Sequence, residues 1–193
     1  MSDYPVRKNL RLKTWDYTSD GTYFLTFCTK GRQCILSAIS SPANRLMDLP
    51  RLHLLPAGEI VDRQIHGLEA TYPWLRLHHY AIMPNHVHLL VEIVSGADGA
   101  SRTPPPTDVG AGLPDRPPCR ADQRIPALIS TLKRFTNRAA GCTLWQRGYH
   151  DHIVRNTDDF QTIWTYIDQN PQKWELDRYY TDTGKERPPC RPS

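Results

Sequence analysis

No stretch of the sequence approaches the roughly 20 consecutive apolar residues that a membrane-spanning helix requires. The amino terminus also lacks the apolar core of a secretory signal peptide, and we therefore expect a cytoplasmic protein. An excess of charge of one sign is absent as well, because 24 Lys and Arg stand against 20 Asp and Glu, a formal net charge of +4. This balance excludes a highly basic protein that coats DNA and a strongly acidic disordered chain, and it permits a partner that carries phosphate.

Cysteine is scarce and follows no metal-binding or redox spacing. The five cysteines are scattered along the chain without any C-x-x-C pair. A zinc ribbon and a dithiol redox centre are therefore excluded, and we expect reduced thiols without a chemical role.

Aromatic residues are absent from residues 95–126, a stretch that contains seven of the chain's 17 prolines. Such a segment buries too little apolar surface to offset the entropy of ordering it. We therefore predict one domain over residues 1–193, with a disordered insertion at about 95–126 and a flexible tail from about 183.

Hydrophobic periodicity divides the rest of the chain into strands and helices. Strands are predicted at residues 21–29, 75–83, 86–94 and 144–155, and helices at 57–70, 127–140 and from 156 or 157 to 170. A short turn at residues 83–85 joins two of the strands into a hairpin. This order predicts an α+β fold, in which helices pack on an antiparallel sheet.

Two histidines alternate with apolar residues in the predicted strand 86–94. His86 and His88 lie on one face of that strand, while Val87 and Leu89 lie on the other. Imidazoles two residues apart on one face can share a metal ion or a phosphate, whereas on a solvated sheet face they would only project into water. The pattern alone leaves both interpretations open.

A tyrosine and an asparagine lie four residues apart on the last predicted helix. Tyr166 and Asn170 therefore project side by side at the rim of its apolar face. A boundary tyrosine and an asparagine that ends the helix before Pro171 would give the same pattern. Together with His86 and His88, however, the amide supplies a third ligand for a divalent ion, with a hydroxyl beside it that can attack phosphorus.

Four blocks of sequence in this order resemble the single-tyrosine HUH transposases, and within them most closely the REP-associated tyrosine transposases. The resemblance runs from about Tyr23 to Trp174, apart from the insertion at 95–126. The blocks are YAIMPNHVHLL at 80–90, LKR at 132–134, LWQRGYHDHIVRN at 144–156 and YIDQNP at 166–171.

The resemblance implies a ferredoxin-like α+β layer, the HUH endonuclease fold, and a set of site residues. His86 and His88 match the pair that binds Mg²⁺ or Mn²⁺, Asn170 the third metal ligand and Tyr166 the nucleophile. The implied substrate is single-stranded DNA with a hairpin, which is cut to leave a 5′-phosphotyrosine and a free 3′-OH. Relatives act as monomers or as homodimers.

Basic residues interleaved with aromatic ones suit single-stranded DNA, because cations follow the phosphates while bases stack on rings. They occur at the amino terminus, on the helix 127–140 and in the segment after it. The candidate DNA-binding residues are Arg11, Lys13, Lys133, Arg134, Arg138, Arg147 and Arg155.

Several alternatives stay open at this point. Tyr149 is a rival nucleophile, and His150 and His152 form a second histidine pair on a predicted strand. A catalytically silent hairpin-binding protein derived from a transposase is the non-enzymatic alternative. A histidine-triad nucleotide hydrolase is the other enzyme, although Leu90 stands where its third histidine would be.

Overall fold

The computed structural model describes residues 20–40, 50–94 and 124–180. The predicted tail from 183 and most of the predicted insertion lie outside these ranges, as do Arg11 and Lys13. The last three residues of that insertion, 124–126, instead form the first turn of a helix. In the described part of the chain no helix combines the length and the hydrophobicity needed to cross a membrane.

A four-stranded antiparallel sheet forms the centre of the molecule, and its strand order is β4-β5-β1-β6. Its strands are β1 (Gly21–Cys28), β4 (Leu75–Ile82), β5 (His86–Ile93) and β6 (His150–Val154). The helices are α1 (Pro56–His66), α2 (Leu68–Thr71), α3 (Arg124–Ala140) and α4 (Thr157–Gln169). Along the chain, β1-α1-β4-β5-α3-β6 is the ferredoxin-like order. The predicted α+β fold class is confirmed.

Two features of the sequence prediction are wrong in detail. The last strand begins only at His150 rather than at 144, because Gly148 takes a positive φ of 80° and turns the chain just before it. A small second sheet, formed by β2 (Ser37–Ser40) and β3 (Arg51–Leu54), was not predicted. Short 3-10 turns, η1 (Lys30–Arg32) and η3 (Trp174–Leu176), follow β1 and α4.

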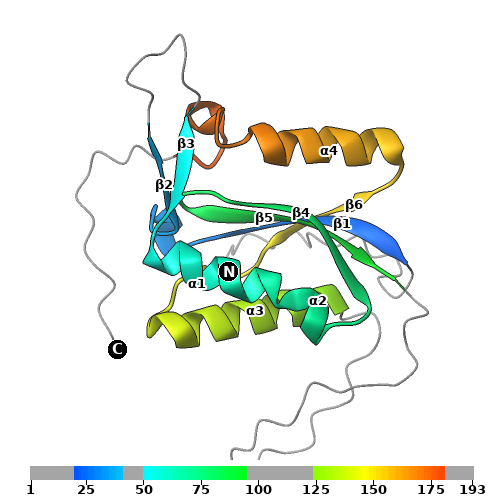
Figure 1. Cartoon of the computed structure of the whole chain (residues 1–193), viewed down its shortest axis with the longest axis horizontal. Helices are drawn as coiled ribbons and strands as arrows, with labels where there is room; N and C mark the ends of the chain where they lie inside the picture. Colours follow the sequence, from blue (N-terminus) through cyan, green and yellow to red (C-terminus); the bar gives the residue numbers. More distant parts are fainter. Residues whose placement is uncertain (1–19, 41–49, 95–123, 181–193) are drawn as a thin grey trace, which may run out of the picture.

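The helices cover both faces of the sheet. Figure 1 shows α1, α2 and α3 on one face and α4 on the other. The larger core joins Leu25, Val87 and Leu89 of the sheet to α1 and α3. A smaller core joins Leu90 to Ile163 and Ile167 of α4. Because β5 is covered on both faces, its apolar run is nearly continuous although the sheet is antiparallel.

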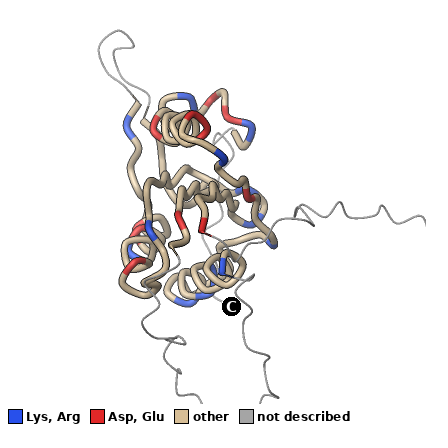
Figure 2. Tube along the Cα trace, turned by 90° about the vertical axis from the view of Figure 1, so that its right-hand side faces the viewer, with Lys and Arg blue, Asp and Glu red and all other residues tan. Residues whose placement is uncertain are grey.

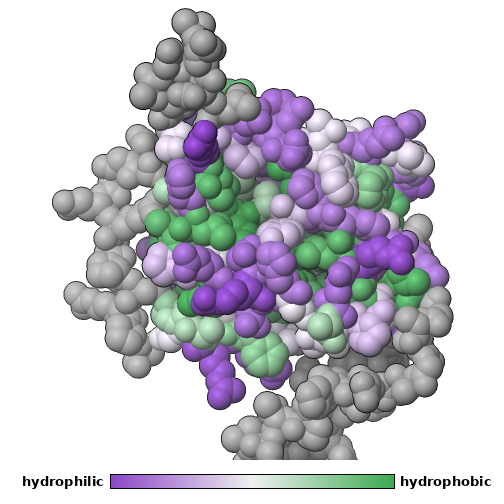
Figure 3. Space-filling model, viewed as in Figure 1, coloured by the Kyte–Doolittle hydropathy of each residue, from purple (hydrophilic) through white to green (hydrophobic). Residues whose placement is uncertain are grey.

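The outer surface of these layers is mixed in character. In the view of Figure 3, hydrophobic side chains show in separate patches between hydrophilic ones. This distribution is ordinary for helices whose apolar stripe faces a sheet.

The helix α4 begins and ends as its sequence predicts. At its start the Asn156 side chain accepts a hydrogen bond from the Asp159 amide (2.8 Å), and Pro171 follows its last turn.

The helix α1 approaches the main chain after β1 so closely that only glycine fits at one position. A Cβ atom at Gly58 would lie 1.9 Å from the carbonyl oxygen of Leu36, which also accepts a hydrogen bond from the Leu55 amide (2.9 Å). We expect Gly58→Ala to lower the free energy of unfolding by roughly 2–4 kcal/mol, because backbone has to move. Urea denaturation measures this effect.

The matched control for that substitution is Gly67→Ala. Gly67 has a right-handed φ of −81°, and a Cβ atom there meets only ordinary contacts at 3.7 Å. We expect this variant to be as stable as the wild type or slightly more stable. Equal stability of the two variants would contradict the close approach at Gly58.

Candidate active site

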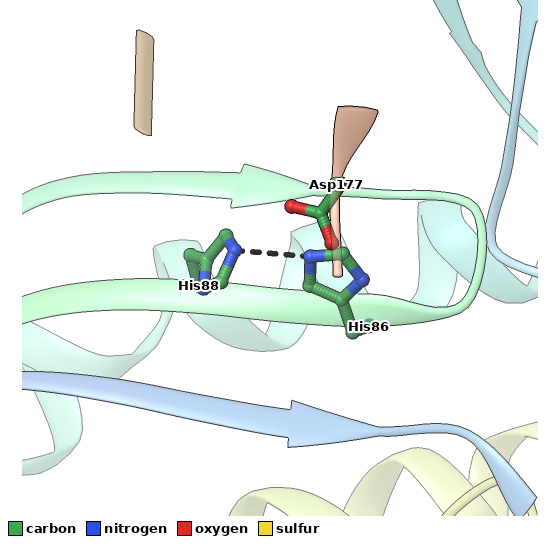
Figure 4. Close-up of side chains that lie close together, drawn as sticks. All are labelled: His86, His88 and Asp177. Carbon is green, nitrogen blue, oxygen red and sulfur yellow. Dashed lines mark hydrogen bonds between the residues drawn. The ribbon is translucent and has the colours of Figure 1, made fainter. Parts of the chain in front are cut away.

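His86 and His88 lie on β5 and point toward α4, where both are buried. Their exposed fractions are 0% and 1%, so the interpretation of a solvated sheet face is excluded. Register explains the placement: His86 lies opposite Cys28 and His88 opposite Thr26 on β1, the strand that is central in the sheet. The two Nε2 atoms are 3.0 Å apart (Figure 4).

The hydrogen bonds around the two rings determine where their protons lie. Asn85 Nδ2 donates to the carbonyl oxygens of Tyr179 (2.7 Å) and Arg32 (3.3 Å), so its Oδ1 faces His86 Nδ1 (2.8 Å) as an acceptor. His86 therefore carries its proton on Nδ1 and has a lone pair on Nε2. His88 Nε2 then donates to this lone pair, and the Thr26 hydroxyl donates to His88 Nδ1 (2.8 Å). A cation in place of the proton between the Nε2 atoms would have two imidazole ligands.

Both rings are held in the neutral form that binds metals. Burial lowers the pKa of His86 to about 3, and the positive charges of Arg178 and Arg32 act in the same direction. Burial, followed by the neighbouring His86, lowers the pKa of His88 well below its ordinary value of 6.5. Protons therefore do not compete with a cation for these nitrogens near neutral pH.

A carboxylate that the sequence analysis did not identify completes the cluster. Asp177 follows η3. One oxygen of its carboxylate and one ring nitrogen each of His86 and His88 all lie within 4.8 Å of one another (Figure 4). Asn170 donates from Nδ2 to Asp177 Oδ2 (3.2 Å), and this nitrogen lies 3.4 Å from His88 Nε2. Its amide oxygen Oδ1 is buried and has no hydrogen-bond partner among the described residues.

These donors fit a divalent cation. Two imidazole nitrogens and one carboxylate form a mixed nitrogen and oxygen set, which suits ions such as Mn²⁺, and the Asn170 amide oxygen would join them if the amide turned over. The orphaned Asn170 oxygen is otherwise unfavourable, because burial of an unpaired polar atom costs about 1–3 kcal/mol. His86, His88, Asp177 and Asn170 are thus the residues that would hold a metal.

Tyr166 lies beside this cluster, at the edge of α4. Its hydroxyl donates to Asp177 Oδ2 (3.1 Å), and its ring centroid is 5.3 Å from that of His88. Burial, followed by the Asp177 charge and hydrogen bond, raises the pKa of Tyr166 to about 12. The phenol is therefore protonated in this arrangement, although 41% of the residue is exposed. The four residues that the resemblance assigns to the site lie close together in the structure: His86, His88, Tyr166 and Asn170.

Residues 171–180, which we call the strap, return from α4 over the histidines. The rings of Tyr179 and Trp174 lie 4.7 Å and 6.0 Å from that of His86, centroid to centroid. The guanidinium groups of Arg178 and Arg32 lie over the Tyr179 ring at 4.5 Å and 5.1 Å. The strap thus covers His86 and brings Arg178 to the site, where Arg32 of η1 meets it at the Tyr179 ring.

The rival residues lie elsewhere or have other contacts. Tyr149 packs against the larger core, the one formed with α1 and α3. His152 donates from Nε2 to both carboxylate oxygens of Asp159 (3.0 and 3.2 Å), so this nitrogen is already engaged. Leu90 belongs to the core beneath α4, where a third histidine of a nucleotide hydrolase would have to lie.

The predicted DNA-binding residues do not gather around the site. Lys133 Nζ donates to the carbonyl oxygens of Gln146 (3.0 Å) and Gly148 (2.6 Å), and burial lowers its pKa to about 8. This ammonium therefore stabilises the loop before β6. Arg134 and Arg138 are exposed on α3, across the sheet from Tyr166, and Figure 2 shows Lys and Arg spread over both helix layers. Arg147 and Arg155 are exposed on the segments that flank β6.

No model of a known protein family matches the sequence. A protein of Haemophilus influenzae (strain Rd KW20), described only as uncharacterized, is 29% identical over 181 residues, which cover 91% of this chain and 94% of that protein. The chain is similar to a solved REP-associated tyrosine transposase bound to a REP hairpin, with a TM-score of 0.48 and 17% identity over 90% of this chain and 74% of that one. It is also similar to a candidate transposase from Deinococcus radiodurans R1, with a TM-score of 0.37 and 19% identity over 82% of this chain and 97% of that one.

The buried histidines predict a pH dependence of stability. Below about pH 6.5 the unfolded chain binds protons at His86 and His88 that the folded chain does not, since their folded pKa values are lowered. The free energy of unfolding of the metal-free protein therefore falls as the pH decreases, by roughly 2 kcal/mol for each histidine between pH 6.5 and 5. Urea denaturation in chelator at both pH values measures this loss.

The double variant His86→Gln/His88→Gln is the control for this pH effect. It retains hydrogen-bonding side chains but cannot titrate, so its loss of stability between the two pH values should be much smaller. An identical loss in variant and wild type would assign the effect to other groups.

Proposed function

We propose that the chain is a metal-dependent tyrosine transposase that cuts and rejoins single-stranded DNA beside hairpins. One observation carries the proposal. The Asp177 carboxylate accepts hydrogen bonds from both the Tyr166 hydroxyl and the Asn170 amide, and it lies next to the buried histidine pair. A tyrosine nucleophile and a cation site at this separation suit transfer of a phosphoryl group to the phenol. The hairpin substrate is supported by the resemblance of the four sequence blocks.

The residues of the chain divide the reaction between them. Tyr166 Oη attacks the scissile phosphorus, the bond from phosphorus to O3′ breaks, a phosphotyrosine ester forms, and O3′ takes up a proton from water to leave as the 3′-OH. The phenolic proton passes to Asp177 Oδ2, which is already its hydrogen-bond acceptor. When bound to His86, His88, Asp177 and Asn170, a divalent ion polarises the phosphate. Attack of a 3′-OH on the ester reverses these steps and rejoins DNA.

The fixed orientation of the histidines supports the same role. Asn85 holds His86 through its Oδ1, and Thr26 holds His88 through its hydroxyl, so neither ring has to reorient for its Nε2 to face the shared position. Partners of this kind on the far nitrogen of a ligating histidine are usual in metal sites. The aromatic contact between Phe24 and His88, with centroids 5.1 Å apart, fixes the second ring further.

A covalent adduct tests the proposal directly. The protein is incubated with Mn²⁺ and a hairpin oligonucleotide that has a single-stranded flank and a label on its 3′ end. We expect a labelled band at the mass of protein plus DNA on a denaturing gel, lost in chelator, with the modified peptide containing Tyr166. Hairpin binding without any adduct would instead support the catalytically silent DNA-binding protein.

A further inference from the structure

A cleft opens beside Tyr166, on the side of the sheet that α4 covers. It has a volume of about 440 Å³, and its walls include Phe24 and Thr26 of β1, His150 of β6, Thr162 and Tyr166 of α4, and Arg178 of the strap. Tyr166 thus forms part of two structures at once, the cluster around Asp177 and the wall of this cleft.

The sheet register determines which side chains face the cleft. Phe24 lies opposite His152 and Thr26 opposite His150 in the pairing of β1 with β6, so these side chains share the α4 side. His152 is held in place by Asp159. His150 is exposed, and no hydrogen bond of its side chain to the described residues is found. The second histidine pair of the sequence therefore belongs to the cleft rather than to a second metal site.

The cleft has an aromatic wall that is already fixed. The Phe24 ring lies 5.1 Å from His88 and meets the Tyr166 ring edge-on at 6.0 Å, centroid to centroid. A planar base can pack on such rings, and this contact contributes about 1–3 kcal/mol per base in single-strand binding. His150 supplies an exposed imidazole that can bind the edge of a base.

The cleft also contains a group that suits a phosphate. Arg178 lines it together with Tyr166, and this exposed arginine donates a hydrogen bond to the Tyr179 hydroxyl. Among the described residues, no ion pair of Arg178 with a carboxylate is found. A guanidinium with free donors binds phosphate well. The cleft therefore combines a guanidinium, an aromatic ring and an exposed imidazole.

We propose that this cleft binds one nucleotide of the single strand, with its 5′-phosphate at Arg178 and its base against Phe24. The inference rests on the proposed function. In an in-line displacement the leaving O3′ lies on the far side of phosphorus from Tyr166 Oη. The nucleotide that stays joined to the tyrosine is therefore the one beside the Tyr166 ring, where the cleft lies. The volume is in the range usual for small-ligand sites.

The test measures nucleotide binding without any cleavage. The four 2′-deoxynucleoside 5′-monophosphates and inorganic phosphate are titrated into the full chain and followed by NMR. Thr162→Trp fills the cleft from an exposed helix position, and Thr165→Trp adds the same side chain outside it. We expect at least one nucleotide to bind more tightly than phosphate, with a loss of tenfold or more in Thr162→Trp and no change in Thr165→Trp.

Further variants separate the binding of the phosphate from the binding of the base. Arg178→Gln should weaken all nucleotides and inorganic phosphate about tenfold, whereas His150→Ala should weaken nucleotides alone. Unchanged Mn²⁺ affinity and melting temperature in Thr162→Trp show that the fold and the metal cluster are intact. Equal binding by the two tryptophan variants, or binding of phosphate with no contribution from the base, would overturn the proposal.

The outcome is distinguishable from failure of the proposed function. If the wild type forms no DNA adduct but binds nucleotides in the cleft, the transposase chemistry is wrong and the nucleotide site stands. If it forms the adduct and Thr162→Trp forms it equally well, the nucleotide site is wrong and the chemistry stands.

Discussion

We expect the replacement of Tyr166 with phenylalanine to abolish the covalent adduct with DNA and to leave hairpin binding nearly unchanged. The substitution removes only the attacking oxygen, while the ring keeps its contacts with His88 and Phe24. Asp177 Oδ2 retains the hydrogen bond from Asn170, so the metal cluster is also preserved. DNA affinity comes mainly from phosphate and stacking contacts, which a single hydroxyl hardly changes. The expected loss of adduct is complete within detection.

Tyr149→Phe is the matched control for this experiment. That ring packs against the larger core, which lies on the opposite side of the sheet from α4 and the histidine pair, so the variant should form the adduct at the wild-type rate. Adduct yield on denaturing gels and hairpin affinity by fluorescence anisotropy are measured for both variants. An adduct formed by Tyr166→Phe would show that another residue is the nucleophile and would make Tyr149 the first one to test.

Removal of either histidine should also abolish cleavage, but by a different route, through loss of the metal. His86→Ala and His88→Ala each delete one of the two Nε2 donors that face each other at 3.0 Å. We expect Mn²⁺ affinity, measured by calorimetry, to fall 100-fold or more and adduct formation to disappear at moderate Mn²⁺. High Mn²⁺ should restore some adduct in the histidine variants and none in Tyr166→Phe, which retains the ion.

One further variant tests Asp177 as a ligand, and another serves as the control. His53 is exposed on β3, so the control variant His53→Ala should bind Mn²⁺ like the wild type. Asp177→Asn removes a charge from the cluster but keeps its shape, and it should weaken Mn²⁺ about tenfold or more if the carboxylate is a ligand. An unchanged Mn²⁺ affinity in both His86→Ala and His88→Ala would show that the cluster is not a metal site.

The sequence was sufficient for those parts of the site that depend on local periodicity. Alternation along a strand places His86 and His88 on one face whatever the rest of the chain does. Helical spacing in the same way places Tyr166 beside Asn170, and the helix ends at Gln169, before Pro171, as expected. The α+β class followed from the order of such segments, each of which is long enough to show its period.

The parts that depend on tertiary contacts could not be predicted. Asp177 and Arg178 lie in the strap, which has no periodic pattern, and they reach the histidines only because the chain folds back after α4. Lys133 looked like a free cation on a helix edge, yet two carbonyl oxygens of a loop distant in sequence bind its ammonium. The strands β2 and β3 are four residues each, too short for alternation to distinguish them from loop.

The strap has a consequence for the time course of metal exchange. Because Trp174 and Tyr179 cover His86, which has no exposed surface, an ion bound at its Nε2 is shielded from solvent on the side of the strap. We expect its dissociation to depend on how often residues 171–180 lift as well as on the strength of the ligand bonds. Chelators should therefore remove the ion slowly and at a rate independent of their concentration. Slow release of the ion, at a rate that does not change with the chelator concentration, would indicate that the strap covers the bound metal.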